Sequence, residues 1–155
     1  MDNFRLGRRI AIDFGAARIG VAISSIDGII ASPLATIPNN DSAIRAIEEL
    51  LAEHELLEIY VGLPLNLQGE RTLSTEAALT FAHQLAVSGV ANLRMLDERM
   101  STRAAQSQLH ASGKNTKQSR SVIDAAAASL ILESAIAFEK STGRLPGKSI
   151  TEFHE

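Results

Sequence analysis

Three acidic residues, Asp13, Glu98 and Asp124, stand in or directly after segments whose hydrophobic pattern predicts burial. An unpaired buried carboxylate costs free energy, so each needs a cation, a hydrogen-bond partner or a water-filled site. The chain of 155 residues contains no cysteine. Disulfides, zinc fingers, iron–sulfur clusters and thiol nucleophiles are therefore excluded, and a metal site would have to use Asp, Glu or His.

Asp13 lies near the end of the predicted strand Arg9–Phe14, just before Gly15. Strand alternation places the two isoleucines of this segment on one face and Ala11 with Asp13 on the other. Because we expect helices on both faces of the sheet, Asp13 is predicted to be partly buried. The same residues also fit an aspartate that only begins the turn into Gly15.

Asp124 lies on a helix predicted over about 116–140. On a helical wheel of about 100° per residue, Asp124 shares its face with apolar side chains and points toward the expected core. These apolar residues are Ala127, Ala128, Ile131, Ala135 and Phe138. The alternative is an aspartate that is stabilised by the helix dipole and paired with Arg120 one turn earlier.

Glu98 belongs to the tripeptide Asp97-Glu98-Arg99, which directly follows the predicted strand Leu93–Leu96. In an open α/β sheet, ligands bind beyond the carboxyl ends of the parallel strands. The tripeptide therefore stands where a site is expected. A solvated loop in which Arg99 forms an ion pair is the alternative.

We expect Asp13, Glu98 and Asp124 to converge near one edge of the first strand. Oxygen ligands without cysteine or clustered histidine favour Mg²⁺ or Mn²⁺. A pair of such ions can activate water and stabilise the leaving oxygen in phosphodiester cleavage. In this hypothesis Asp13 and Asp124 hold the ions, and Glu98 completes the ligand set or orients the attacking water.

Basic residues are concentrated in the last third of the chain, where they could contact an anionic ligand. Lys117 and Arg120 fall on the same helical face as Asp124, nearer the helix N-terminus, which itself favours an anion. A solvated basic surface is the alternative. The formal net charge of −3 excludes a polycation that coats nucleic acid through its average field, so binding would need a local patch.

These residues are positioned by a predicted alternation of strands and helices. Three closely spaced strands, Arg9–Phe14, Ile19–Ser24 and Ile29–Ile37, indicate an antiparallel meander. Further strands are predicted over Leu57–Val61 and Leu93–Leu96, and helices from about Ser42, over Thr75–Val87, from Ser101 or Thr102 to near Gly113, and over 116–140. We therefore predict an α/β fold with a five-stranded mixed sheet, the meander plus two parallel strands, and helices on both faces.

The length predicts one domain over residues 1–140. Residues 141–155 are rich in Gly, Pro, Lys and Ser and are predicted to form a flexible tail. Since no segment resembles a secretory signal or a membrane span, we expect a cytoplasmic protein without membrane contact.

Five motifs in a fixed order over about Arg9–Glu139 resemble the YqgF/RuvX family of pre-16S rRNA nucleases, also described as Holliday-junction-resolvase-like proteins of the RNase H-like superfamily. They are Ile12-Asp13-Phe14-Gly15, Arg18-Ile19-Gly20-Val21-Ala22, Val61-Gly62-Leu63-Pro64 with Gly69, Asp97-Glu98-Arg99 with Ser101-Thr102, and Lys117 to Asp124 with the alanine run.

The resemblance implies an RNase H-like fold and a cytoplasmic nuclease that trims the 5′ end of pre-16S rRNA in ribosome biogenesis, with Mg²⁺ or Mn²⁺ as cofactor. It also implies that Asp13, Glu98 and Asp124 are the catalytic and metal-binding carboxylates. The predicted nucleic-acid contacts are Arg18, Arg99, Lys117 and Arg120.

The segment after the fourth predicted strand supplies no carboxylate until Glu70. A ligand from this strand is therefore either absent or replaced by Glu98.

Other functions use the same residues. A resolvase of branched DNA would employ the same carboxylates and would require a homodimer, whereas an RNA nuclease could act as a monomer. A non-catalytic RNA-binding assembly factor would give the carboxylates a structural role. Asp13-Phe14-Gly15 also resembles the phosphate loop of actin-like and sugar-kinase-like ATPases, but the chain is too short for their two-lobed cleft.

Overall fold

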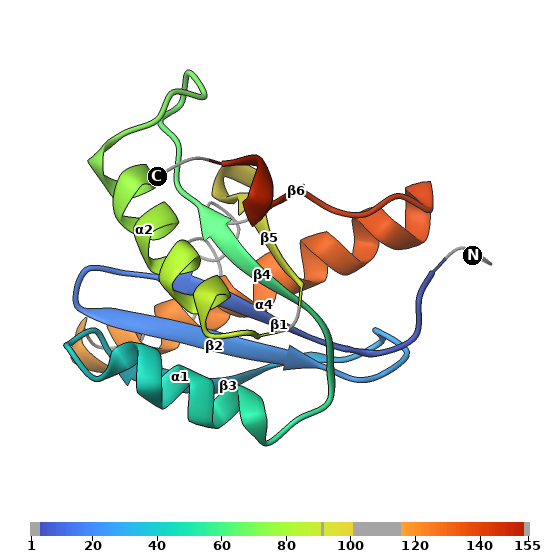
Figure 1. Cartoon of the computed structure of the whole chain (residues 1–155), viewed down its shortest axis with the longest axis horizontal. Coiled ribbons are helices and arrows are strands. Elements are labelled where there is room, and N and C mark those ends of the chain that lie inside the picture. Colours follow the sequence, from blue (N-terminus) through green and yellow to red (C-terminus); the bar gives the residue numbers. More distant parts are fainter. Residues whose placement is uncertain (1–3, 91, 101–115, 154–155) are drawn as a thin grey trace.

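The structure, a computed structural model, has strands and helices close to where the sequence predicts them (Figure 1). It describes residues 4–90, 92–100 and 116–153; the side chains of Met100 and of residues 116–125 lie outside the description. The strands are β1 (Arg8–Phe14), β2 (Arg18–Ser24), β3 (Ala31–Pro38), β4 (Leu56–Leu63), β5 (Leu93–Asp97) and β6 (Lys148–Ser149). The helices are α1 (Ala43–Ala52), α2 (Leu73–Val87) and α4 (Thr116–Thr142), with 3-10 turns η1 (Glu98–Met100) and η2 (Ile150–Glu152). The helix predicted from Ser101 or Thr102 lies outside the described residues.

The six strands form one mixed sheet in the order β3-β2-β1-β4-β5-β6. β1, β2 and β3 pair antiparallel, as the predicted meander requires. β4 pairs parallel to β1, and β5 pairs parallel to β4. The carboxyl ends of β1, β4 and β5 therefore meet at one edge of the molecule, where a ligand site is expected.

The prediction of five strands is wrong, because part of the segment that we assigned to a tail forms β6 and η2. Lys148 and Ser149 pair antiparallel with β5. The Arg94 guanidinium donates hydrogen bonds to the carbonyl oxygens of Pro146 (2.6 Å) and Gly147 (2.9 Å). Ile150 is buried in the hydrophobic core. Composition alone suggested a tail, whereas these long-range contacts order the segment.

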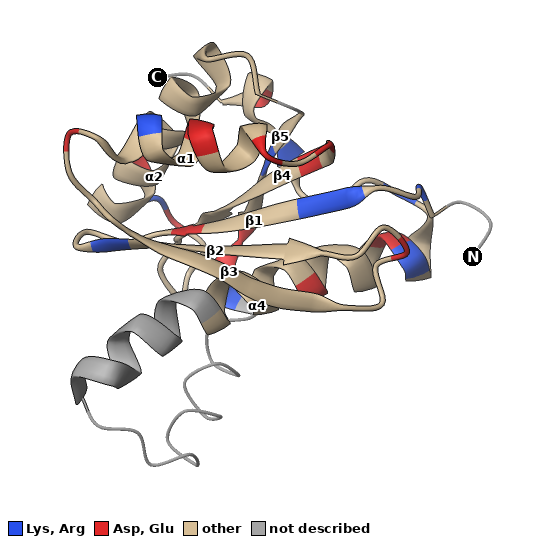
Figure 2. Cartoon of the chain, turned by 90° about the horizontal axis from the view of Figure 1, so that it is seen from below, with Lys and Arg blue, Asp and Glu red and all other residues tan. Residues whose placement is uncertain are grey.

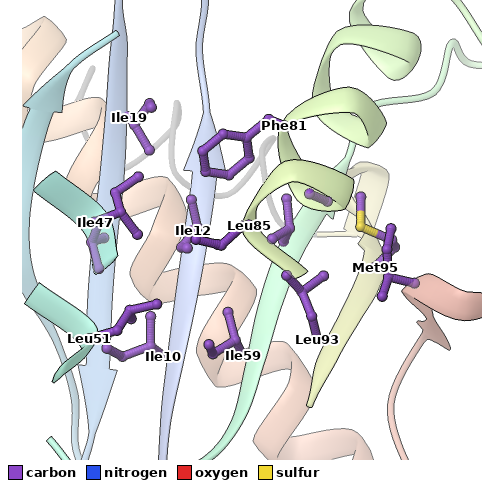
Figure 3. Close-up of a cluster of buried hydrophobic side chains, with 14 of the residues drawn as sticks. Ile10, Ile12, Ile19, Ile47, Leu51, Ile59, Phe81, Leu85, Leu93 and Met95 are labelled. Atoms are coloured by element: carbon purple, nitrogen blue, oxygen red, sulfur yellow. The ribbon is translucent and has the colours of Figure 1, made fainter. Parts of the chain in front are cut away.

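Hydrophobic side chains cover both faces of the sheet, as the alternation in β1 predicts. Ile10 and Ile12 pack on the side of α1 and α2 (Figure 3). Ala11 packs on the opposite side against α4 residues that include Ala128 and Ala135. Figure 2 shows the sheet between α4 on one side and α1 and α2 on the other. Small side chains at this interface allow α4 to approach the sheet closely.

A buried ion-pair network fixes α4 to the sheet at the end where β1 begins. Arg9 and Glu139 are 0% and 1% exposed, and the Arg9 guanidinium lies 3.2 Å from both Glu139 carboxylate oxygens. Arg5 donates to Glu139 at 2.8 and 3.0 Å and to Glu58 at 2.7 Å. The Tyr60 hydroxyl donates to Glu58 at 2.9 Å. Strands β1 and β4 are thereby joined to α4.

We expect Glu139→Ala to lower the free energy of unfolding by about 3 kcal/mol, because Arg9 would keep a buried charge without this partner. Burial alone would raise the pKa of Glu139, but the hydrogen bonds from Arg5 and the charges of Arg9 and Arg5 hold that pKa at about 2. Since this is below the ordinary value of 4.5, the stabilisation is present above about pH 4.5 and is lost as the pH falls toward 2. Urea unfolding at neutral and acidic pH measures both effects.

The matched control is Glu133→Ala, which removes an exposed carboxylate from the same helix. Equal unfolding midpoints for the two variants at neutral pH would contradict the assigned role of Glu139.

None of the helices described in the structure is long and apolar enough to cross a membrane.

Candidate active site

Asp13 lies on the central strand β1, on the face that α4 covers. Its partner in the register of β2 is Gly20. Ala11, two residues earlier on the same face, is fully buried in the cluster that includes Ala128 of α4. Asp13 itself is partly buried, as predicted. Strands on both sides of β1 hold its backbone, so this carboxylate has a rigid support.

Gly62 of β4 provides the space in which the Glu98 carboxyl group lies. Ile12 of β1 pairs with Val61 of β4. Asp13 and Gly62 are the next residues on these two strands, and Gly62 pairs with Leu96 of β5. A Cβ atom at Gly62 would lie 2.6 Å from Cγ and 2.7 Å from Cδ of Glu98. Real Cβ atoms do not approach other atoms so closely. β4 thus contributes room for the Glu98 carboxyl rather than a carboxylate of its own.

Glu98 and Asp13 meet above this glycine. Burial, followed by the hydrogen bond with Asp13 and the negative charge of Asp13, raises the pKa of Glu98 to about 9. The charge of Asp97 contributes in the same direction. Two acidic groups at such short range cannot both ionise without a large electrostatic cost. A divalent cation between them would remove that cost.

The structure thus brings together two of the three predicted carboxylates, Asp13 and Glu98. The third, Asp124, lies on α4 one turn before Ala128, and its side chain is outside the description. The same holds for the side chains of Lys117 and Arg120. Within the described part of the chain, no group of three Asp, Glu, His or Cys residues is arranged to hold a metal ion.

Asp97 and Arg99 bind each other instead of entering the Asp13–Glu98 contact. Asp97 accepts hydrogen bonds from the Arg99 backbone N–H (2.9 Å), from Nε (2.9 and 3.0 Å) and from Nη2 (2.5 Å). These bonds lower the pKa of Asp97, which burial alone would raise. The ion pair that was the alternative interpretation of this tripeptide is therefore present, with Asp97 as its acid.

Arg18 begins β2, directly after the turn that follows Asp13. Its carbonyl oxygen accepts a hydrogen bond from the Gly15 N–H at 3.0 Å. Asn39 fixes the same turn. Its side chain donates a hydrogen bond to the carbonyl oxygen of Gly15 at 2.7 Å, and its backbone N–H donates one to the carbonyl oxygen of Ala17 at 3.0 Å. Asn39 and the steric role of Gly62 were not predicted from the sequence. The available signal was a polar residue directly after a strand and a glycine inside one.

We expect Gly62→Ala to lower metal-dependent activity by about tenfold to a hundredfold, because the new Cβ must displace the Glu98 carboxyl from its contact with Asp13. The fold should persist, since the carboxyl can move toward solvent. Cleavage rates and circular dichroism of the variant measure the two effects. The double variant Gly62→Ala/Glu98→Asp, with a shorter acid, should recover part of the loss. Wild-type activity in Gly62→Ala would contradict the described packing.

A sequence model of the RuvX family, described as Holliday junction resolvase, matches residues 7–137. A protein of Leifsonia xyli named "Putative pre-16S rRNA nuclease" is 45% identical over 148 residues, which cover 94% of this chain and 96% of that protein. A protein of Streptomyces coelicolor with the same name is 45% identical over 152 residues, which cover 96% of this chain and 90% of that protein.

Among solved structures, RuvC of T. thermophilus in complex with a Holliday junction substrate superposes with a TM-score of 0.53, covering 92% of this chain and 98% of that one. The two are 12% identical, so the likeness concerns the fold. It supports the predicted α/β architecture with a mixed sheet. The family match covers most of the chain, and so do the relatives with 45% identity. The chain therefore belongs to the RuvX family of nucleases.

Proposed function

We propose that the protein is a metal-dependent nuclease that hydrolyses phosphodiester bonds at the carboxyl ends of β1, β4 and β5. The observation that best supports this proposal is the contact of Glu98 with Asp13 above Gly62. Paired acids at the end of a central strand, held by a rigid sheet, are suited to bind cations beside a phosphate.

The residues present fit Mg²⁺ or Mn²⁺. The donors are carboxylate oxygens, which these hard cations prefer, and the chain has no cysteine to favour a softer metal. The Glu98 carboxyl lies over Gly62 beside Asp13, so the two acids could share an ion. Asp13, Glu98 and Asp124 would hold the ions. When bound, such ions lower the pKa of water and stabilise charge on the leaving oxygen.

The other predicted residues would bind the substrate. Arg18 follows the ordered turn after Asp13, so its guanidinium is suited to contact the phosphate backbone near the scissile bond. Lys117 and Arg120 would contact phosphates from the first turns of α4. Glu98 would hold its proton in the metal-free protein near neutral pH and release it when a cation enters.

The substrate that we propose is the 5′ end of precursor 16S rRNA, in the cytoplasm during ribosome biogenesis. The names of relatives with 45% identity support this choice. Branched DNA is the second candidate, because the matching family is described as Holliday junction resolvase. Parallel cleavage assays with a precursor 16S rRNA fragment and a four-way DNA junction test the choice. Cleavage of neither substrate in Mg²⁺ or Mn²⁺ would contradict the proposed function.

We expect Mn²⁺ binding to release about one proton per protein molecule and to strengthen with increasing pH. The pKa of about 9 means that metal-free Glu98 is protonated near neutral pH, and a carboxylate must lose its proton to bind metal. Between about pH 6 and 8 the apparent affinity should therefore rise by up to tenfold per pH unit. Isothermal titration in two buffers with different ionisation enthalpies measures the proton count.

Glu98→Gln is the control for this titration, because the amide has no proton to release at that position. Mn²⁺ binding that is independent of pH in the wild-type protein would exclude Glu98 from the ligand set.

A further inference from the structure

The three charged side chains of Asp97-Glu98-Arg99 make two different sets of contacts. Glu98 lies over Gly62, whereas Asp97 and Arg99 bind each other. We propose that Arg99 is a positioning residue for the nuclease reaction. Through Asp97 it holds Glu98 in place, and through Gly69 it holds the loop of residues 65–71 beside the site. This inference rests on the proposed function.

Glu98 directly follows the last residue of β5. β5 ends at Asp97, whose partner in β4 is Leu63, so Glu98 lies just beyond the hydrogen-bonded ladder of the sheet. The Glu98 carboxyl group lies over Gly62, so its place there depends on how the backbone at Glu98 is held. Beyond the end of the ladder, that backbone needs another support. The bonds that Asp97 accepts from the Arg99 backbone and guanidinium close a tight turn around Glu98 and provide this support.

The loop of residues 65–71 follows β4 and projects beyond its carboxyl end (Figure 1). A Cβ atom at Gly69 would lie 3.0 Å from Nη1 of Arg99 and 3.5 Å from its Cζ, so the guanidinium packs directly on this glycine. Gly69 has φ +82°, a conformation that favours glycine. Arg99 therefore bridges the end of β5 and the loop after β4.

The loop itself is well ordered, so contact at one point can position all of it. The Asn66 side chain accepts hydrogen bonds from the backbone N–H groups of Gln68 (3.0 Å) and Glu70 (2.8 Å). Leu65 and Arg71 form an isolated antiparallel bridge at its base. Leu67 at its tip is 81% exposed. A loop that packs on Arg99 and exposes Leu67 can contact the substrate strand.

The test is a double-variant cycle with Asp97→Asn, Arg99→Lys and the combination of both. Lysine keeps the charge but lacks the planar fork that binds a carboxylate at two points. We expect each single variant to lower kcat about 10- to 100-fold, to change KM less than about threefold and to weaken Mn²⁺ binding severalfold. The combined variant should be no worse than the single ones, because both remove one contact. Thermal stability should change little.

Arg45→Lys is the control. Arg45 is an exposed arginine on α1, outside the loop of residues 65–71. Its kcat should equal that of the wild-type protein.

Several outcomes would overturn the inference. If Arg99→Lys keeps the wild-type kcat, or if its only effect is a higher KM, then Arg99 contacts phosphate and does not position Glu98. If Asp97→Asn loses Mn²⁺ affinity while Arg99→Lys keeps it, then Asp97 is itself a metal ligand. If the losses of kcat in the two single variants add up fully in the combined variant, then Asp97 and Arg99 act independently of each other.

A readout independent of activity separates this inference from the proposed function. Hydrogen exchange of the amides in 65–71 and at Arg99 should become several times faster in both single variants but not in Arg45→Lys. If the wild-type protein neither binds Mn²⁺ nor cleaves nucleic acid, the proposed function fails, and exchange still tests the bridge. Unchanged exchange in both single variants overturns the bridge.

Discussion

Asp13→Asn should abolish Mg²⁺- or Mn²⁺-dependent cleavage, with kcat lower by about 10³-fold or more, while the protein remains folded. Asparagine has nearly the same shape as aspartate but presents one neutral oxygen and an NH₂ group, so a cation loses a charged ligand. β1 pairs with strands on both sides, which keeps the substituted side chain in place. Single-turnover cleavage and Mn²⁺ titration measure the loss, and circular dichroism measures the fold.

Asp41→Asn is the control for this substitution, because Asp41 is an exposed aspartate before α1. It should cleave like the wild-type protein. Full residual activity in Asp13→Asn would remove Asp13 from the mechanism, and loss of folded structure would assign it a structural role.

Glu98→Gln should lower kcat by about 10³-fold and, at the same time, raise the stability of the metal-free protein above neutral pH. The pKa of Glu98 in the folded protein, about 9, lies above the ordinary value of 4.5. The folded state thus holds a proton that the unfolded chain releases. The stabilisation from this proton is complete below about pH 4.5 and is lost as the pH rises through 9.

Glutamine does not titrate, so the variant escapes this loss. In EDTA at about pH 8, we expect its free energy of unfolding to exceed that of the wild-type protein by about 1–2 kcal/mol, and at about pH 5 the two should be nearly equal. Thermal melts at the two pH values test this directly. Mn²⁺ should raise the melting temperature of the wild-type protein more than that of the variant, which keeps Asp13 and Asp124 as ligands.

The exposed Glu49→Gln on α1 is the control, with no expected change in either property. A Glu98→Gln protein that is less stable than the wild-type protein at about pH 8 would show that the negative charge of Glu98 is well compensated without metal.

Local periodicity was sufficient to place Asp13. Alternation along β1 fixed which face it occupies, and the packing of Ala11 against α4 agrees with that face. The position of Glu98 beyond β5 followed from the rule on the carboxyl ends of parallel strands. Both features depend on residues close in sequence or on a general property of α/β sheets.

Features that depend on how segments far apart in the sequence pack against each other could not be predicted. The role of Gly62 exists only because Glu98, 36 residues later, turns back over β4 (98 − 62 = 36). The strand at Lys148–Ser149 was missed because two residues carry no periodic signal, and its partner β5 lies about 50 positions earlier. Which acid of the tripeptide binds Arg99 also depended on the local turn geometry, which hydrophobic patterns do not encode.

Among the residues that the structure describes, β6, a strand of two residues, pairs with the outer edge of β5, and this has a consequence for biosynthesis. While the polypeptide emerges from the ribosomal tunnel, the backbone groups along that edge stay unpaired until Lys148 and Ser149 have left the tunnel. An unpaired strand edge can form hydrogen bonds with another nascent polypeptide and start aggregation. Stop codons or frameshifts a few positions before Lys148 should therefore yield insoluble protein even though Asp13, Glu98 and Asp124 have already been made.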